Sequence, residues 1–295
     1  LVKYMYDNLE DFGEYLAIDG KAVQSYATTY SKETKEDGRR DTDANWGTKK
    51  YTTSVNSKGE VVTNKVTWFG YTVHLVVDAK YELPVAFKVT PASNSEQMQA
   101  KEILKAMHEE QLEKCKYFMA DKGYDDTKII EYLKEKGIAA IIDIRNMWKD
   151  GEETKQYKDT DVVYTYDGKV YYIDENGNQI KLRYLGYDKS SDSLRYGFKP
   201  QYNDNRVFRI KCDTDKRIFV TVARDSKKWA REYKKRTSVE RVNGRIDRDY
   251  EFEDHTIRGI KKMDLYVTAS LIVMLSMAKS KIEANNYNHL AALIS

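Results

Sequence analysis

The chain contains little cysteine, no long apolar run and almost no net charge, and each absence excludes a class of protein. Its 295 residues include two cysteines, Cys115 and Cys212, too few for a disulfide framework or a cysteine-based zinc site. No apolar run approaches the roughly 20 residues of a membrane span. The nearest one, 265–278, contains a threonine and two serines, so we expect a buried helix of a soluble, cytoplasmic protein without a membrane partner. A net charge of +3 does not by itself indicate a nucleic-acid partner.

What the chain does contain is a strongly basic segment, residues 224–248. It holds ten Lys or Arg against four Asp or Glu, so it alone carries a net charge of +6. Residues 229–248 have a helical register, which predicts that Tyr233, Arg236 and Glu240 lie on one face of a single helix. Gly244 weakens such a helix by about 1 kcal/mol relative to alanine, so we expect a packing or functional reason for it. Glu240 is then either a salt-bridged surface acid or a metal ligand among phosphate-binding neighbours.

Apolar and amphipathic patterns before residue 147 predict an α/β domain, a mixed sheet with helices on its faces. The expected order of elements is βββαβαβ, followed by helices. Asp19 and Asp121 are each predicted to stand at the C-terminal end of a strand. Residues 29–65 are polar and lack periodicity, which predicts a long loop. The predicted strands are 15–18, 68–79, 83–91, 116–120 and 138–144, and the predicted helices are 95–110, 127–137 and 261–283.

The composition changes near residue 147, where tyrosines begin to alternate with polar residues. Turn signals recur at Asp167-Gly168 and at Glu175-Asn176-Gly177, which is typical of short strands joined by hairpins. We therefore expect three parts in the chain. Residues 1–146 would form the first part of the core, 147–223 an inserted β-rich subdomain, and 224–295 a helical second part that carries the third acid.

In combination, these motifs resemble the DDE transposases of bacterial insertion sequences. The resemblance is carried by Asp19 in AIDGK, Asp121 in ADKGYD and Glu240 in Y-x-x-R-x-x-x-E, and it extends over about residues 15–280. It is nearest to members with a β insertion between the second Asp and the Glu, and it implies an RNase H-like catalytic core. The resemblance also implies an N-terminal DNA-binding domain, which we expect to be missing or minimal in this sequence. Seven positions after the Glu the family has a basic residue, whereas this chain has Asp247, with Arg245 and Arg248 as the nearest substitutes.

The resemblance implies a metal-dependent DNA transposase, which cleaves phosphodiester bonds at element ends and transfers the strand to target DNA. Asp19, Asp121 and Glu240 would hold two Mg²⁺ ions, replaceable by Mn²⁺, because carboxylates are the hard oxygen ligands that such ions prefer. The implied partners are double-stranded DNA and a second copy of the chain in an active homodimer. Tyr233 and Arg236 would contact phosphates near the cut. Further basic residues would neutralise the DNA backbone: Lys234, Lys235, Arg241, Arg245 and Arg248.

Other interpretations of the same residues remain open at this point. An RNase H-type nuclease would cut without joining, and a domesticated transposase would bind DNA without catalysis. Glu232 is the nearest rival of Glu240 as the third acid. His74 is expected to be a hydrogen-bonded core residue, Asp78 a turn acid, and Trp229 a packing residue rather than a platform for a base.

Overall fold

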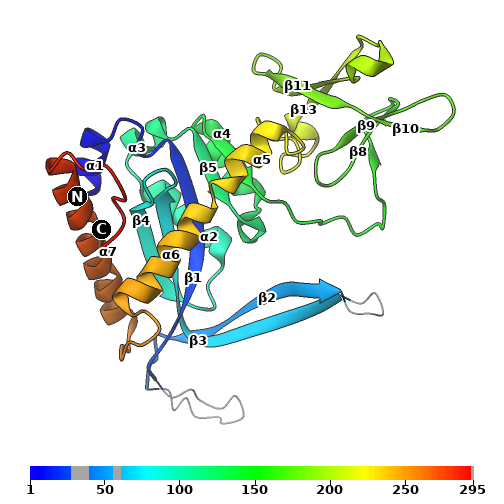
Figure 1. Cartoon of the computed structure of the whole chain (residues 1–295). Helices are drawn as coiled ribbons and strands as arrows, with labels where there is room; N and C mark the ends of the chain where they lie inside the picture. The colour runs from blue at the N-terminus through cyan, green and yellow to red at the C-terminus, as the bar shows by residue number, and fades with distance from the viewer. Residues whose placement is uncertain (28–39, 56–60, 294–295) are drawn as a thin grey trace, which may run out of the picture. The chain divides into compact units, whose positions relative to one another are not determined.

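The computed structural model describes residues 1–27, 40–55 and 61–293, and for 50–55 and 61–64 it describes the backbone alone. It is a mixed α/β structure, as the sequence predicted, and it divides into two compact units (Figure 1). The first unit comprises Leu1–Gly13, Ile18–Met107 and Thr237–Ser295, and the second comprises Glu14–Ala17 and His108–Arg236. Strand β1, Tyr15–Gln24, passes from the second unit into the first between Ala17 and Ile18.

The sheet of the first unit is built around strand β3, Val61–Asp78, which has β1 as one neighbour. The first part of β3 pairs antiparallel with β2, Asn45–Val55, and its second part with β4, Leu83–Pro91. Gly70 lies where these two parts meet. A side chain there would come within 2.2 Å of the carbonyl oxygen of Val23, so only glycine permits this close approach of β1.

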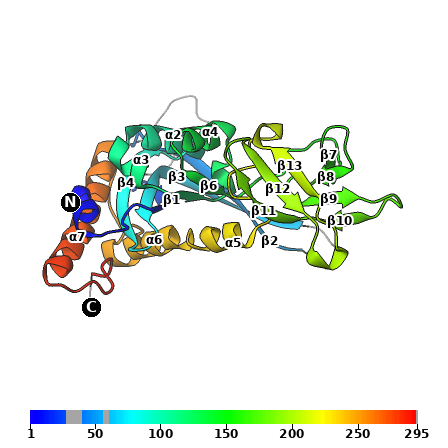
Figure 2. The ribbon, with the colours of Figure 1, turned by 90° about the horizontal axis from the view of Figure 1, so that it is seen from above.

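Helices α2, α6 and α7 pack on this sheet in the first unit, and α1 packs on α7. Helices α2 and α6 cover its opposite faces (Figure 2), while α7 packs against β4 and α1. Their bounds are α1 Val2–Asn8, α2 Glu96–Ala106, α6 Thr237–Tyr250 and α7 Ile260–Glu283. By length and composition α7 could cross a membrane, but a core helix passes the same test, and the buried side of α7 contributes Met263, Val267 and Met274 to the core.

In the second unit, the first residues of β1 pair in parallel with β5, Tyr117–Ala120, which pairs in parallel with β6, Ala139–Ile142. The helices α4 and α5 pack against these strands on opposite faces. The bounds of the helices are α3 Glu109–Lys114, α4 Thr127–Glu135 and α5 Lys227–Lys234, with a 3-10 turn η1 at Lys122–Tyr124.

Between β6 and α5 the second unit contains two small antiparallel sheets, ordered β10-β9-β8-β7 and β11-β12-β13. Tyr157, Tyr164 and Tyr196 are buried in the hydrophobic core of this region, so tyrosines contribute to its packing. The strands are β7 Lys155–Gln156, β8 Val162–Tyr164, β9 Val170–Ile173, β10 Gln179–Lys181, β11 Arg183–Asp188, β12 Ser193–Gly197 and β13 Val207–Lys211, followed by the 3-10 turn η3 at Cys212–Thr214.

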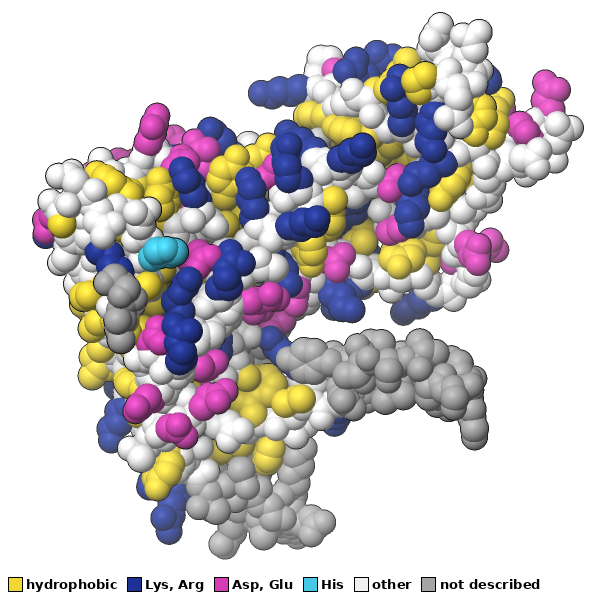
Figure 3. Space-filling view, in the orientation of Figure 1, with side chains coloured by type: hydrophobic (Ala, Val, Ile, Leu, Met, Phe, Trp, Pro, Cys, Tyr) yellow, Lys and Arg dark blue, Asp and Glu magenta, His cyan; other side chains and the backbone are white. Residues whose placement is uncertain are grey.

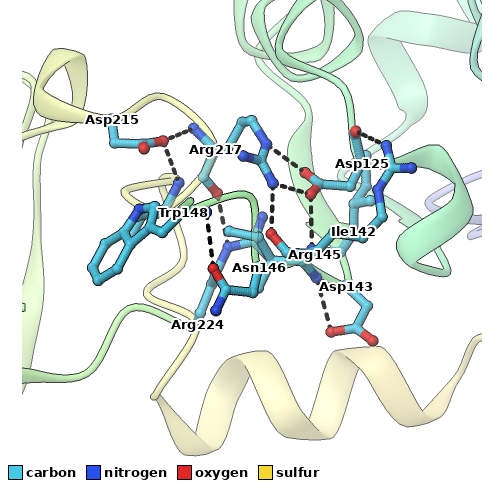
Figure 4. A network of polar contacts seen from close by, with 11 residues as sticks. Asp125, Ile142, Asp143, Arg145, Asn146, Trp148, Asp215, Arg217 and Arg224 are labelled. Atoms are coloured by element: carbon cyan, nitrogen blue, oxygen red, sulfur yellow. Dashed lines mark hydrogen bonds and ion pairs between the residues drawn. The ribbon is translucent and has the colours of Figure 1, made fainter. Parts of the chain in front are cut away.

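A network around the buried carboxylate of Asp125 joins the two ends of this region (Figure 4). Arg217 donates from Nε to Asp125 Oδ1 at 3.1 Å and forms an ion pair with its other oxygen. The backbone N–H of Arg145 donates to Asp125 Oδ2 at 2.9 Å. Arg224 donates to the carbonyl oxygens of Arg217 and Ile142, and burial lowers its pKa to about 10, although nearby carboxylates oppose this. The chain leaving β6 and the chain returning to α5 are thus held together by buried polar contacts.

The prediction of a long loop over 29–65 was wrong for 45–55 and 61–65, which form β2 and the start of β3. Residues 29–39 and 56–60 lie outside the described part of the chain. These strands were missed because they are rich in Thr and Lys and do not show an alternation of apolar and polar residues, although Thr favours strands. The predicted order of elements therefore lacked β2. The predicted helix 95–110 extends past the end of α2 and stops at the start of α3, which was not predicted as a separate helix.

The prediction of one helix over 229–248 was also wrong, since α5 ends at Lys234 and α6 begins at Thr237. The break is tight: Lys235 and Arg236 donate their N–H groups to the carbonyl oxygens three residues before them. Thr237 and Ser238 follow, and both residue types have low helix propensity. Tyr233 and Arg236 therefore do not share a continuous helix with Glu240.

Candidate active site

Asp19 lies within β1 and not at its end, where the sequence had suggested the strand stops. Leu16, Ala17 and Ile18 just before it are fully buried, so the core holds this part of the strand. Asp19 itself is half-buried. Its Oδ1 accepts a hydrogen bond from the N–H of Gly20 at 2.9 Å, and its Oδ2 accepts one from Asn243 Nδ2 of α6 at 3.3 Å.

Helix α6 has a buried apolar side and, next to it, a polar side that contacts β1. Val239, Val242 and Ile246, at helical spacing, are buried. Asn243 and Asp247 lie next to this apolar stripe, and Asp247 forms an ion pair with Lys21 of β1. Glu240 is exposed and precedes Asn243 by one turn on the same side of the helix. The structure thus brings the helix that carries Glu240 alongside the strand that carries Asp19.

The basic residues of α6 are engaged in ion pairs within the chain. Arg241 and Arg245 both pair with Glu82, in the turn between β3 and β4. Arg248 pairs with its neighbour Asp249 and is largely exposed. Neither suggested substitute for the family's basic residue therefore faces Asp247, which is paired with Lys21 instead.

Asp121 belongs to the second unit, where it directly follows β5. Its Oδ1 accepts the N–H of Gly123 at 2.7 Å and so caps η1. The parallel register pairs Ala17 of β1 with Met119 of β5, so Asp19 and Asp121 each follow the last paired residues by two positions. Asp126 rather than Asp121 caps α4 by accepting the N–H groups of Lys128 and Ile129.

Tyr233 and Arg236 also lie in the second unit. The ring of Tyr233 stacks on Trp229, with centroids 4.7 Å apart, and the Arg236 guanidinium lies 5.6 Å from the Tyr233 ring. Trp229 therefore packs, as predicted. Burial raises the pKa of Tyr233, and the charges of Asp143 and, more weakly, Asp121 act in the same direction. The Tyr233 hydroxyl is therefore close enough to Asp143 and Asp121 for their charges to affect its pKa.

Lysines beside α5 have different environments. The Lys235 ammonium lies 3.4 Å from the centroid of the Tyr15 ring and pairs with Glu232 at 2.6 Å. Lys234 is exposed. Glu232, the rival third acid, is buried and also pairs with Arg231 at 2.8 Å. Burial acts to raise its pKa, but the hydrogen bonds from Lys235 and Arg231 prevail and lower it, so Glu232 serves as a structural ion-pair acid.

Two other titratable residues are structural, as the sequence indicated. His74 is fully buried, and its Nε2 is 3.0 Å from Thr90 Oγ1. Asp78 accepts the N–H groups of Lys80, Tyr81 and Gly13 and so fixes the turn after β3. Burial raises the pKa of Asp78 to about 6, against these hydrogen bonds.

The sequence analysis missed two polar residues at this site, Asn243 and Lys21. The available signals were their spacings: Asn243 follows Glu240 by three residues on a helix, and Lys21 follows Asp19 by two on a strand. Asn243 Oδ1 is buried and has no hydrogen-bond partner among the described residues.

The donors near Asp19 are of the kind that a hard divalent cation prefers, namely carboxylate and amide oxygens. The orphaned Oδ1 of Asn243 beside the Asp19 carboxylate fits such an ion. Within the described ranges, the structure does not gather three or more His, Cys, Asp or Glu side chains into a group that could hold a metal.

Comparisons with known proteins identify the family of this chain. Residues 13–275 match the family model described as the transposase DDE domain. No curated protein matches the chain. Among solved structures, it is similar to a chain in the cryo-EM structure of a piggyBac transposase synaptic complex with hairpin DNA. The identity is 9% and the TM-score 0.40, over 94% of this chain and 52% of that one, so this chain spans about half of that protein's length. Because the family model covers most of its residues, the chain belongs to the family of transposase DDE domains.

Proposed function

We propose that this chain is the catalytic domain of a DNA transposase, in which Asp19, Asp121 and Glu240 form the DDE triad. It would cleave phosphodiester bonds at the ends of a mobile element and join the freed end to target DNA. The observation that carries this proposal is the matched register of the two aspartates, each two residues beyond the paired residues Ala17 and Met119. Their equal spacing predicts that both side chains leave parallel strands on the same face.

The contact between β1 and α6 supports Glu240 as the third acid. Asn243 binds Asp19, and Glu240 lies one turn earlier on the same side of α6. The three carboxylates would hold a pair of Mg²⁺ ions, with Mn²⁺ as a substitute. When bound, these ions activate the attacking water or hydroxyl and stabilise the charge that develops on the phosphate.

We further propose an RNase H-like core in 1–146 and 224–295, with 147–223 as an inserted subdomain. Support comes from the parallel pairing of β1, β5 and β6 and the antiparallel pairing of β3 and β4. This core would carry the three acids. It would also carry Tyr233 and Arg236, which would position the scissile phosphate, Arg236 through two hydrogen bonds from its guanidinium.

The inserted sheets support double-stranded DNA as the partner. Arg195 of β12 stands directly opposite Arg209 of β13, although like charges directly across a sheet destabilise it. The Arg195 guanidinium lies over Gly186, where a side chain would come within 3.1 Å of it. Arg183 of β11 is exposed nearby, two positions along in the register. Lys and Arg side chains gather over this region in Figure 3, and a DNA backbone would neutralise them.

The test is cleavage of a plasmid or a labelled element end in Mg²⁺ or Mn²⁺. Asp19→Asn, Asp121→Asn and Glu240→Gln should each abolish cleavage and leave DNA affinity nearly unchanged. Glu253→Gln, at an exposed acid outside the site, is the matched control and should cleave normally. Wild-type cleavage by any triad variant would remove that residue from the triad.

Product analysis with a pre-cleaved end separates the proposed function from its rivals. Joined products identify a transposase, whereas cleavage without joining identifies a nuclease of the RNase H type. DNA binding without any cleavage by the wild-type chain would identify a domesticated, non-catalytic protein. A homodimer in the active complex would appear as two chains on paired ends in size measurements of the DNA-bound protein.

A further inference from the structure

Asn243 is the side chain that links the strand of Asp19 to the helix of Glu240. Its Nδ2 donates to Asp19 Oδ2 at 3.3 Å, while the N–H of Gly20 donates to Asp19 Oδ1 at 2.9 Å. Each carboxylate oxygen of Asp19 therefore receives one N–H, and together these two donors restrict the orientation of the carboxylate.

The other half of the Asn243 amide is unsatisfied. Its Oδ1 is buried and accepts no hydrogen bond within the described part of the chain. Leaving a buried acceptor without a partner costs about 1–3 kcal/mol, so such groups in native proteins call for an explanation. Because the two amide atoms share one small planar group, this oxygen lies beside the Asp19 carboxylate. An acceptor next to a carboxylate would be repelled by it unless a cation or a hydrogen-bond donor lies between them.

A second contact runs parallel to the first. Lys21 is two residues beyond Asp19 on β1, and Asp247 is four residues beyond Asn243 on α6, and these two form an ion pair. Two residues of a strand advance about 6.6 Å and four residues of a helix about 6 Å. The strand and the helix thus advance by nearly the same length between the two contacts. The two contacts together therefore set the register of α6 on β1, and with it the location of Glu240.

We propose that Asn243 is a positioning residue for a divalent cation with the oxygen preference of Mg²⁺. Its amide nitrogen orients the Asp19 carboxylate, and its amide oxygen is a further hard donor to the shell of the cation held there. This inference rests on the proposed function, because it concerns the same metal site. It assigns Asn243 a role that the three acids do not fill: keeping Asp19 in one orientation both before and after the cation binds.

Mn²⁺ binding to the full chain without DNA tests the role directly, because free Mn²⁺ can be counted by electron paramagnetic resonance. Asn243→Ala should weaken Mn²⁺ binding about 10–100-fold, the usual effect of removing a residue that orients a metal ligand. Asn243→Asp, which retains an oxygen donor, should bind Mn²⁺ at least as well as the alanine variant. Asn178→Ala, the same change at an exposed turn outside the site, should not alter binding. Urea unfolding of Asn243→Ala should show a stability close to that of the wild type, because the change also removes the unsatisfied oxygen.

The outcomes separate this inference from the proposed function. If the wild-type chain binds Mn²⁺ and cleaves DNA while Asn243→Ala binds Mn²⁺ equally well, Asn243 has no positioning role and the proposed function stands. If Asn243→Ala and Asn243→Asp lose binding only in proportion to a loss of folded protein, the residue is structural and the inference is overturned. If the wild-type chain neither binds Mn²⁺ nor cleaves DNA, the proposed function itself fails.

Discussion

Lys21 of β1 forms an ion pair with Asp247 of α6, seven positions after Glu240, where related transposases have a basic residue. The side chain of Lys21 is only 10% exposed. The positive charge near this turn of α6 is therefore the Lys21 ammonium of the strand, and the negative charge is the Asp247 carboxylate of the helix. This arrangement accounts for an acid at a position where the resemblance led us to expect a base.

Reversing one charge of this pair should destabilise the first unit. Asp247→Lys would place two ammonium groups together, and we expect a loss of about 1–3 kcal/mol in the free energy of unfolding, the range for a charged hydrogen bond lost in a half-buried place. The double variant Lys21→Asp/Asp247→Lys should recover much of that loss. A double-mutant cycle by urea unfolding measures the coupling, and a coupling near zero would show that the pair does not hold α6.

Gly244 offers a test of whether DNA approaches α6 closely. It is exposed in the middle of the helix, and a Cβ there would meet nothing within 4 Å, so the packing reason that we expected for this glycine is absent. Gly244→Ala should therefore stabilise the chain by about 1 kcal/mol. A concurrent fall in DNA cleavage would mean that substrate approaches the backbone there. Unchanged cleavage would leave the glycine without a functional reason.

The cross-strand pair Arg195 and Arg209 should affect DNA binding and stability in opposite directions. Replacing both by glutamine should lower the slope of log affinity against log salt by up to about 1.8, at about 0.9 for each lost phosphate contact. Stability should stay the same or rise by a few tenths of a kcal/mol, because two like charges no longer face each other, and the exposed ion pair of Arg209 with Asp188 that is lost with them contributes little. The control Lys114→Gln/Lys128→Gln removes two charges from α3 and α4. An equal effect of the control on the slope would show that only net charge matters.

Arg217 should be essential for folding of the second unit, because it compensates the buried charge of Asp125. Arg217→Ala leaves that carboxylate with no guanidinium, and removing one partner of a buried pair costs about 3–5 kcal/mol. Its neighbour Lys216 pairs with Glu131 at the surface, so Lys216→Ala should cost less than about 1 kcal/mol. Thermal unfolding of the two variants compares a buried with an exposed ion pair one residue apart, and equal losses would contradict the interpretation.

His74 should make the first unit sensitive to acid. Burial lowers its pKa to about 4, and Lys49 and Lys88 act in the same direction, whereas an unfolded histidine has a pKa near 6.5. Between these values the unfolded chain binds more protons than the folded one. Stability that is fully present above pH 6.5 is therefore lost as the pH falls towards 4, by an amount on the order of 3 kcal/mol.

Urea unfolding of the wild type and His74→Gln between pH 4 and pH 7.5 measures this loss. The raised pKa of Asp78, about 6, gives a slope of the opposite sign between about pH 4 and 6. The difference between the two curves, and not the wild-type curve alone, therefore reports on His74. Parallel curves would show that His74 is not the acid-sensitive group.

Much of the fold was predictable because it depends on local patterns. The strand-turn-strand of β3 and β4 and the short paired strands after residue 147 follow from alternation and turn residues. Strand β2 and the start of β3 were missed because they are polar. They lack the alternation of apolar and polar residues from which strands are predicted. The break between α5 and α6 was missed because a tight turn costs only a few hydrogen bonds and leaves the spacing of charges almost helical.

The sequence by itself indicated the acids of the proposed site, namely two aspartates near the ends of predicted strands and a glutamate in a basic helical segment. Family membership is shown by a match that extends over residues 13–275, and not by these three residues alone. Only the tertiary structure decided that Asn243 donates a hydrogen bond to Asp19. It also decided the two ion pairs, Lys21 with Asp247 and Arg245 with Glu82. These partners are separated by 163 to 226 residues along the chain, so no local pattern links them. The buried side chains of Val239, Val242 and Ile246 fix the position of α6 on the sheet. That position determines which charged side chains of the helix and the strand come into contact.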